Sequence, residues 1–360
     1  TSCIPRLKED IVNQLRHEKY DLFIFSDMGS AFVNEFNTYK HDVIIADHHQ
    51  VNDAEAESNV VHINPHLFGI DGSKDLCGAG VAYKLVEALY EKREIPKEEV
   101  QLYIELVAVA TICDVVSLQD ENRVFVVNGL KQLNHTRNCG LRALISANEL
   151  SDLKLDAYHV GFRLGPCLNA AGRLETAEKA IDLLLEEDTG LALPKAQYIK
   201  SVNDERRELT ERGVEQAEEY LRNAPEMKVF VIYLPDCHES LAGIIAGRIR
   251  EKYHHPVLVA VDANEQGMLK GSGRSIEEYQ MVEALQECED ILSKYGGHAM
   301  AAGFSLPAEN LDSFTARLNE NCELMEDAFI PKVKIDVPMP ISYVTEELIE
   351  EIEGLAPFGK

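Results

Sequence analysis

Three residues able to bind a metal or move a proton, Asp47, His48 and His49, stand at the end of the apolar run 43–46. A short, fully apolar run is typical of a buried parallel strand, and ligands of open α/β sheets bind beyond the carboxyl ends of such strands. Aspartate and histidine offer oxygen and nitrogen donors that suit Mn²⁺, Zn²⁺ or Fe²⁺, while an unliganded imidazole can transfer protons. The tripeptide alone indicates either a metal site or a buried hydrogen-bonded cluster.

Two further carboxylates occupy comparable positions. Asp27 closes the apolar strand pattern of residues 21–27, and Asp114 follows the apolar run 106–113. An acid after such a run must be paired, liganded or exposed. If Asp27, His48 and Asp114 converge from strand ends or helix ends, they form the donor set that metal-assisted hydrolysis needs. Each aspartate taken singly is also a common turn or cap residue.

The elements that must position these residues alternate between strand-like and helix-like patterns. Residues 21–27, 43–46 and 59–63 are typical of strands, and residues 78–89, which open with small residues, are typical of a helix. This alternation predicts an α/β fold in which helices wrap a parallel sheet.

A long polar segment at residues 195–223 carries a narrow apolar stripe, which predicts a helix that bridges two domains. We expect a smaller α/β unit after it. Its predicted elements are strands at 227–234 and 256–261, a helix at 241–253, a turn region rich in glycine and serine at 268–275, and a segment at 295–306 that leads into Pro307 and another helix.

Composition limits the class of protein. With 360 residues, the chain is long enough for two domains with their own cores. No apolar run is long enough to cross a membrane and no signal segment opens the chain, so we expect a cytoplasmic location. The eight cysteines are scattered without CxxC pairs, which disfavours a zinc ribbon or disulfide framework and favours buried reduced thiols.

The formal net charge of −27 argues against a broad basic surface for nucleic acid, since such binding rests on neutralising phosphates with lysine and arginine. A polyanionic ligand would need a local site made of bound cations and a few basic side chains. The candidates are Arg163, Arg173, Arg248, Arg250 and Arg274, with His254 and His255 near by in the sequence.

Five motifs occur in the order seen in the DHH phosphoesterase superfamily, which the chain resembles along nearly its whole length. They are Ser-Asp-Met-Gly-Ser at 26–30, Asp-His-His at 47–49, Ile-Cys-Asp-Val-Val at 112–116, Asn-Ala-Ala-Gly-Arg at 169–173 and Gly-Gly-His at 296–298. Ser-Gly-Arg-Ser at 272–275 resembles the RecJ branch in particular. The resemblance implies an exonuclease of DNA repair and recombination that degrades single-stranded DNA, or RNA, from 5′ to 3′, releases 5′-mononucleotides and uses Mn²⁺ or Mg²⁺.

The resemblance also implies a domain order and possible protein partners in repair or replication. We expect an N-terminally incomplete DHH domain at residues 1–190, a connecting helix at 191–224, a DHH-associated substrate-binding domain at 225–325 and the start of a further C-terminal domain at 326–360.

Site roles follow from the same resemblance. Asp27, His48 and Asp114 are the implied metal ligands, and Asp114 is also counted with His49 and Asp47 as catalytic. His49 would act on the scissile phosphate or leaving group, and Asp47 would orient a histidine. The implied substrate-binding residues are Arg6, Arg173, Arg274, Gly296, Gly297 and His298. The two glycines are expected to form a turn, either a simple one or one whose amides face phosphate as a nest.

One family motif, an Asp-x-Asp-x-Asp-Gly segment after the first strand, is absent. Thr1-Ser2 and Ile4-Pro5-Arg6 resemble residues that follow it in the family. We therefore expect this sequence to be a piece of a longer protein, cut or compressed just past the motif that supplies the ligands of a second metal ion in the family. On this interpretation the piece alone is folded, binds one metal or binds metal weakly, and is nearly inactive.

Three functions remain open. The first is the RecJ-like exonuclease. The second is a phosphodiesterase of the same superfamily that acts on short oligonucleotides or cyclic dinucleotides. The third is a non-catalytic replication or repair subunit that keeps the fold without the metal centre.

Overall fold

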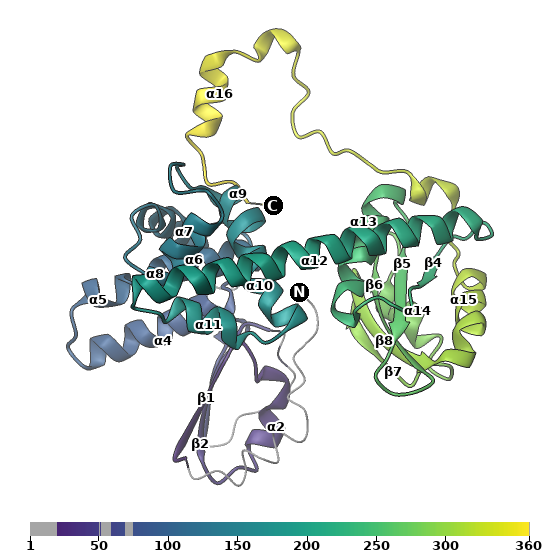
Figure 1. Cartoon of the computed structure of the whole chain (residues 1–360), viewed down its shortest axis with the longest axis horizontal. Helices are drawn as coiled ribbons and strands as arrows, with labels where there is room; N and C mark the ends of the chain where they lie inside the picture. The colour runs from purple at the N-terminus through teal and green to yellow at the C-terminus, as the bar shows by residue number, and fades with distance from the viewer. Residues whose placement is uncertain (1–19, 50, 52–58, 69–74, 360) are drawn as a thin grey trace. The chain divides into compact units, whose positions relative to one another are not determined.

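The structure is a computed structural model that describes residues 20–49, 51, 59–68 and 75–359 (Figure 1). It divides into two compact units. The larger unit comprises the described parts of Ile4–Asn169, Ala177–Lys200 and Met339–Lys360, and the smaller unit comprises Ala170–Thr176 and Ser201–Pro338 together with residues at the chain start that are not described.

The larger unit contains a parallel sheet in the order β1-β2-β3, which confirms the three strands expected there. Its strands are β1 (Leu22–Ser26), β2 (Asp42–Ala46) and β3 (Val60–Ile63). Phe25 pairs in register with Ile45, and both are buried against Phe36 of the short helix α2 (Val33–Phe36). The alternation of strand side chains thus buries one face of the sheet on an apolar cluster.

Most of the rest of the larger unit is helical. Its further helices are α3 (Pro65–Phe68), α4 (Gly78–Lys92), α5 (Lys97–Gln101), α6 (Ile104–Cys113), α7 (Asp120–Leu133), α8 (Cys139–Ala147), α9 (Ala157–His159), α10 (Gly165–Leu174), which runs into the smaller unit, α11 (Glu178–Leu184) and α16 (Glu346–Glu353). The run before Asp114 is therefore a helix. A β-carbon on Gly129 of α7 would lie 2.3 Å from that of Ala108 in α6, so the missing side chain lets these two helices pack closely.

The predicted bridging helix is present as α12 (Thr189–Asn223), which begins before the predicted Lys195 and contains Pro194 (Figure 1). Its residues up to Lys200 belong to the larger unit, and those from Ser201 belong to the smaller unit.

The smaller unit holds a five-stranded sheet in the order β4-β5-β6-β8-β7. The strands are β4 (Phe230–Tyr233), β5 (Val257–Asp262), β6 (Met268–Arg274), β7 (Lys294–His298) and β8 (Ala301–Pro307), and only β4 and β5 pair in parallel. Helix α13 (Ala242–Tyr253) packs on the face that carries Val257 and Val259. Helices α14 (Met281–Gln286) and α15 (Leu311–Glu320) contribute to the core on the other face, around Phe304 and Phe314.

Two turn predictions are wrong. Residues 268–275 form strand β6 up to Arg274, and the pair Gly296-Gly297 lies inside the edge strand β7. The glycines of β6 are imposed by packing, since a β-carbon on Gly271 would lie 2.1 Å from Cζ of Phe304 and one on Gly273 would lie 2.9 Å from Sδ of Met281. The turn of amides predicted at Gly296 and Gly297 is therefore absent, and these residues belong to a paired strand instead.

The described part of the chain also bears on two compositional expectations. Its seven cysteines are all free thiols, but the expectation that they are buried holds for only four of them, since Cys113, Cys139 and Cys237 are partly exposed. None of its helices combines the length and the apolar character that crossing a bilayer requires.

Candidate functional site

The ends of neighbouring parallel strands bring Asp27 and Asp47 to one edge of the sheet. The amide of Asp27 donates to the carbonyl of Ala46 at 2.9 Å, and the amide of Asp47 donates to the carbonyl of Ile63 at 3.0 Å. Asp27 has a φ of 60°, a left-handed conformation that costs an L-residue roughly 1–2 kcal/mol. Backbone strain of this kind is concentrated at functional sites, where the surrounding structure holds it.

His48 lies between the two aspartates predicted as its partners. Its Nε2 atom is 3.2 Å from Oδ1 of Asp27 and 3.6 Å from Oδ2 of Asp114. Asp114 is the C-cap of α6, and Val115 after it also has a left-handed backbone, with a φ of 59°. The structure thus brings together three side chains that come from two strand ends and one helix end.

The N-terminus of α4 packs directly against Asp27. A β-carbon on Gly78, the first residue of that helix, would lie only 2.2 Å from Oδ1 of Asp27. Glycine is therefore required here for close packing, and the helix N-terminus adds a partial positive charge beside a carboxylate.

Asp47 is a buried hydrogen-bond acceptor that fixes the local backbone. Its side chain is 1% exposed. Its Oδ1 accepts from Nδ1 and from the amide of His49 and from the amide of His48, and its Oδ2 accepts from the amide of Ser30. Burial opposes ionisation, but the hydrogen bonds from His49 and Ser30 outweigh it and lower the pKa of Asp47 to about 2. The ionised carboxylate holds the proton of His49 on Nδ1 and leaves Nε2 as the atom that can act on a substrate.

A second layer of polar residues, which the sequence did not reveal, supports the two histidines. Ser30 Oγ lies 2.9 Å from Nε2 of His62, and Asn64 donates to Ser30 Oγ and to the carbonyl of His49. Nε2 of His66 contacts the carbonyl of His48 at 3.0 Å. The one available signal was that Asn64 follows a strand, as Asp27 and Asp47 do. Such outer contacts orient metal-binding histidines.

The donor set fits a divalent cation. One ligand atom from each of Asp27, His48 and His49 lies within 4.8 Å of the others, and Asp114 approaches the same His48 nitrogen. The hydrogen bond to Asp27 raises the pKa of His48. The negative charge of Asp114 raises this pKa further, and burial lowers it. A bound cation would replace the extra proton of the charged imidazole, because imidazole binds metals in its neutral form. Mixed carboxylate and imidazole donors suit Mn²⁺, Fe²⁺ or Zn²⁺.

The predicted arginines of the smaller unit meet at the start of α13. Arg173 donates to the carbonyl of Ser240 at 3.1 Å, and a β-carbon on Gly243 would lie 2.7 Å from Nη2 of Arg274. Arg274 also donates to Ser272 Oγ at 2.9 Å. Two guanidinium groups beside a helix N-terminus form an environment that favours phosphate.

His298 lies on the same face of the sheet as Arg274. Both residues pair in register with Ala301 of the strand between them, so two strand spacings, about 10 Å, separate them. Gly297 has a φ of 151°, and a β-carbon on it would lie 2.4 Å from the carbonyl oxygen of Ala301. Arg6 lies outside the described residues.

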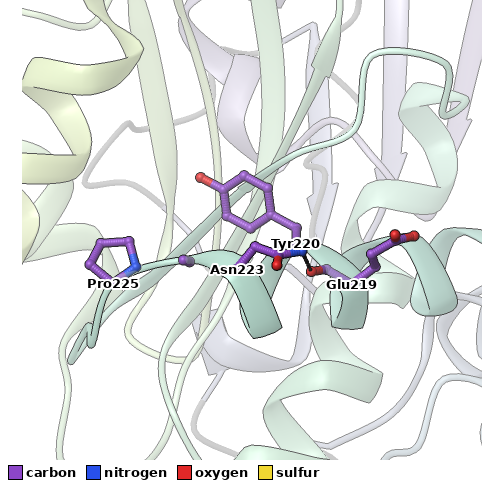
Figure 2. A pocket seen from close by; sticks show the side chains of 5 residues that line it. Glu219, Tyr220, Asn223 and Pro225 are labelled. Carbon is purple, nitrogen blue, oxygen red and sulfur yellow. Dashed lines mark hydrogen bonds between the residues drawn. The ribbon is translucent and has the colours of Figure 1, made fainter.

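A hollow near the end of α12 is not part of either cluster. Figure 2 shows its lining, which includes Glu219, Tyr220, Asn223 and Pro225. Asn223 donates to the carbonyl of Glu219 at 2.9 Å. None of the predicted site residues lines this hollow.

Two family models match the chain. The DHH family N-terminal domain matches residues 2–111, and the DHHA1 domain matches residues 226–324.

Sequence relatives and solved structures agree with these matches. The single-stranded-DNA-specific exonuclease RecJ of Bacillus subtilis is 35% identical over 98% of this chain, and the chain spans 45% of that relative's length. The Mn²⁺ complex of RecJ from Thermus thermophilus has a TM-score of 0.82 at 33% identity, over 97% of this chain and 52% of that one. The Mg²⁺ complex of the same protein has a TM-score of 0.77 at 32% identity, over 94% of this chain and 49% of that one. A further exonuclease RecJ bound to manganese has a TM-score of 0.76 at 34% identity, over 89% of this chain and 79% of that one.

Proposed function

Because the chain belongs to the DHH phosphoesterase family, in its RecJ-like branch, we propose that it is the catalytic part of a metal-dependent exonuclease. The substrate would be single-stranded DNA, degraded from 5′ to 3′ with release of 5′-mononucleotides. The observation that carries this proposal is the convergence of Asp27, His48 and Asp114 at one sheet edge. The names of the relatives support DNA as the substrate class, and action in DNA repair and recombination would place the protein in the cytoplasm, with repair or replication proteins as partners.

Each group has a distinct part in this proposal. Asp27, His48 and Asp114 would hold Mn²⁺ or Mg²⁺. The bound cation supplies an activated water and neutralises charge on the phosphodiester. His49, with its Nδ1 proton held by Asp47, keeps a basic Nε2 that can exchange a proton with the attacking or leaving oxygen.

Substrate phosphates would be held in the smaller unit by Arg173, Arg274 and His298. Arg274 is kept in place by Ser272, and Arg173 is tied to Ser240. Held guanidinium groups lose less conformational freedom on binding, so their phosphate contacts are stronger. Strand β7 pairs with β8 on one side only in the described sheet, so amides on its open side can add backbone donors, and the antiparallel pattern allows only one of Gly296 and Gly297 to do so.

The test is product analysis with excess protein, Mn²⁺ and a 5′-labelled oligonucleotide. We expect slow release of mononucleotides from single-stranded but not double-stranded DNA, and none from Asp114→Ala. Cleavage confined to dinucleotides would favour the small-substrate phosphodiesterase. Absence of both hydrolysis and Mn²⁺ binding would favour the non-catalytic subunit, whereas Mn²⁺ binding without hydrolysis would follow from the absence of the first acidic motif. Full activity in excess chelator would contradict the metal mechanism.

A further inference from the structure

One face of the sheet in the smaller unit is open over strands β6, β8 and β7. Phe304 and Leu306 of β8 are buried in the core on the opposite face. Successive side chains of a strand point to opposite faces, so the residues that alternate with these two point away from that core. They are Ala301, Gly303 and Ser305, and each is partly exposed.

The register of the strands places nine residues of the open face in three rows that run across β6, β8 and β7. The first row is Arg274-Ala301-His298, the middle row is Ser272-Gly303-Gly296 and the third row is Lys270-Ser305-Lys294. The two outer residues of a row are separated by two strand spacings, about 10 Å, and the first and third rows lie four residues apart, about 13 Å along the strands. Two pairs of basic side chains therefore border a middle row of serine and glycine.

The middle row, called the glycine floor below, lacks bulky side chains for a reason other than packing. A β-carbon on Gly296 would meet no atom within 4 Å, and one on Gly303 would come no closer than 3.8 Å to the carbonyl oxygen of Gly271. Gly271 itself faces the core, where its β-carbon would lie 2.1 Å from Cζ of Phe304. Glycine inside a strand often marks a site where a ligand approaches the backbone closely. The glycine floor is thus suited to a flat group that lies against the sheet.

The two lysines of the third row are exposed and can bind an anion. Lys294 forms no ion pair within the part of the chain that the structure describes. Lys270 lies 2.8 Å from Glu239, and the two side chains are 48% and 46% exposed. An ion pair so exposed is weak, so a phosphate can compete with Glu239 for this lysine. None of the nine residues in the rows is acidic, although the chain carries a net charge of −27.

We propose that Lys270 and Lys294 bind one phosphate of a single nucleic-acid strand while the first row binds another, with a nucleoside of that strand lying on the glycine floor. This inference rests on the proposed function, because it takes a single strand as the ligand. The first and third rows are far enough apart that a strand of several nucleotides can reach both and a mononucleotide cannot. The lysines therefore add affinity for longer strands.

Binding of two probes, measured by calorimetric titration with Ca²⁺ to suppress cleavage, tests the proposal. The long probe is a 5′-phosphorylated strand of eight thymidines, and the short probe is thymidine 5′-monophosphate. Replacing Lys270 and Lys294 together by alanine should weaken the long probe about tenfold or more and leave the short probe within about twofold of wild type. The slope of log K against log salt for the long probe should fall by about 0.7 for each lysine removed.

Two further variants separate this effect from misfolding and from net charge. Gly303→Val fills the glycine floor without a clash, and valine suits a strand, so thermal stability should stay the same or rise while the long probe binds about tenfold more weakly. Replacing Lys332 and Lys334 together by alanine removes the same charge from exposed residues outside the sheet of the smaller unit. This control should bind the long probe within about twofold of wild type.

The outcomes distinguish this inference from the proposed function. If Arg274→Ala weakens the long probe while the Lys270, Lys294 and Gly303 variants bind it as wild type does, the inference is overturned and the proposed function stands. Equal losses in the double lysine variant and in its control would show a general effect of charge and would also overturn the inference. A wild-type protein that binds neither probe would contradict both.

Discussion

The two aspartates beside His48 and His49 differ in what surrounds them. Asp47 is buried and accepts hydrogen bonds from three backbone amides and one imidazole. The side chain of Asp114 is 27% exposed and approaches His48 through one oxygen at 3.6 Å. Replacing Asp47 should therefore lower the stability of the fold, and replacing Asp114 should weaken metal binding.

Replacing Asp114 by alanine should abolish Mn²⁺ binding at this site with little change in the free energy of unfolding. The side chain contributes charge to a carboxylate-rich centre, and its removal also removes repulsion from Asp27. Calorimetric titration with Mn²⁺ and urea unfolding measure the two quantities. Unchanged metal affinity would remove Asp114 from the centre.

Replacing Asp47 by alanine should lower the free energy of unfolding by about 3 kcal/mol, because it leaves the buried amide of Ser30 and the partly buried amide of His48 without an acceptor. Asp47→Asn keeps one oxygen acceptor and serves as the control, with a smaller loss. Urea unfolding of the three proteins measures the difference. Equal stability of wild type and Asp47→Ala would contradict the anchoring role.

Glu105 leads to a prediction about pH. Burial raises the pKa of Glu105 in the folded protein above its value in the unfolded chain. The stability that the protonated carboxyl allows is fully present below the unfolded pKa, and it is lost as pH rises through the folded pKa, because the buried carboxylate then ionises. Glu105→Gln should thus be more stable than wild type at neutral pH, and this advantage should shrink toward pH 4. Thermal unfolding across a pH series measures it. An advantage independent of pH would contradict the buried charge.

At the scale of elements, the close approach of α4 to Asp27 has a direct test. Gly78→Ala would place a methyl group 2.2 Å from the carboxylate, so Asp27 must shift and Mn²⁺ affinity should fall about tenfold or more. Gly80→Ala is the matched control, since its β-carbon would come no closer than 3.5 Å to Leu76. Calorimetric titration compares the two. Equal affinity in both variants would mean that Asp27 does not need its observed position.

The sequence predicted those elements whose pattern reflects their own burial. The apolar run that became β2 is largely buried in the parallel sheet, and the stripe of α12 faces an apolar cluster. The run that became β1 buries only Phe25 and leaves Leu22 and Ile24 exposed, so the expected burial of that strand is wrong. Strand β6 was missed because its glycines and polar residues imitate a turn. Their cause lies in Phe304 and Met281, which occupy the space of the missing side chains and are remote in sequence.

The candidate site was predicted to the same extent. Asp27 and His48 follow parallel strands, so their convergence could be expected from strand ends. Asp114 is the C-cap of helix α6, so its place beside them did not follow from that rule. The hydrogen bonds made by Asn64 and His62 could not be predicted, because hydrogen bonds between separated segments leave no periodic pattern in the sequence.

At the scale of the whole molecule, the net charge of −27 limits how DNA can be held. Affinity should rest on a few contacts, so Arg274→Ala should cost about 1.5–3 kcal/mol of binding and the salt dependence should be shallow. Binding of a short 5′-phosphorylated strand across a salt series, with Ca²⁺ to suppress cleavage, measures both. Unchanged affinity in Arg274→Ala and His298→Ala would mean that the smaller unit does not grip the substrate.

The central claim is that Asp27, His48 and Asp114 form a metal centre. The most direct measurement is a crystal structure grown with Mn²⁺, in which anomalous scattering identifies the ion without reference to activity. We predict an anomalous peak bound by His48 Nε2 and by the carboxylates of Asp27 and Asp114. Mn²⁺ absent from this position at saturating concentration, or bound elsewhere with His48 still paired to Asp27, would contradict the account.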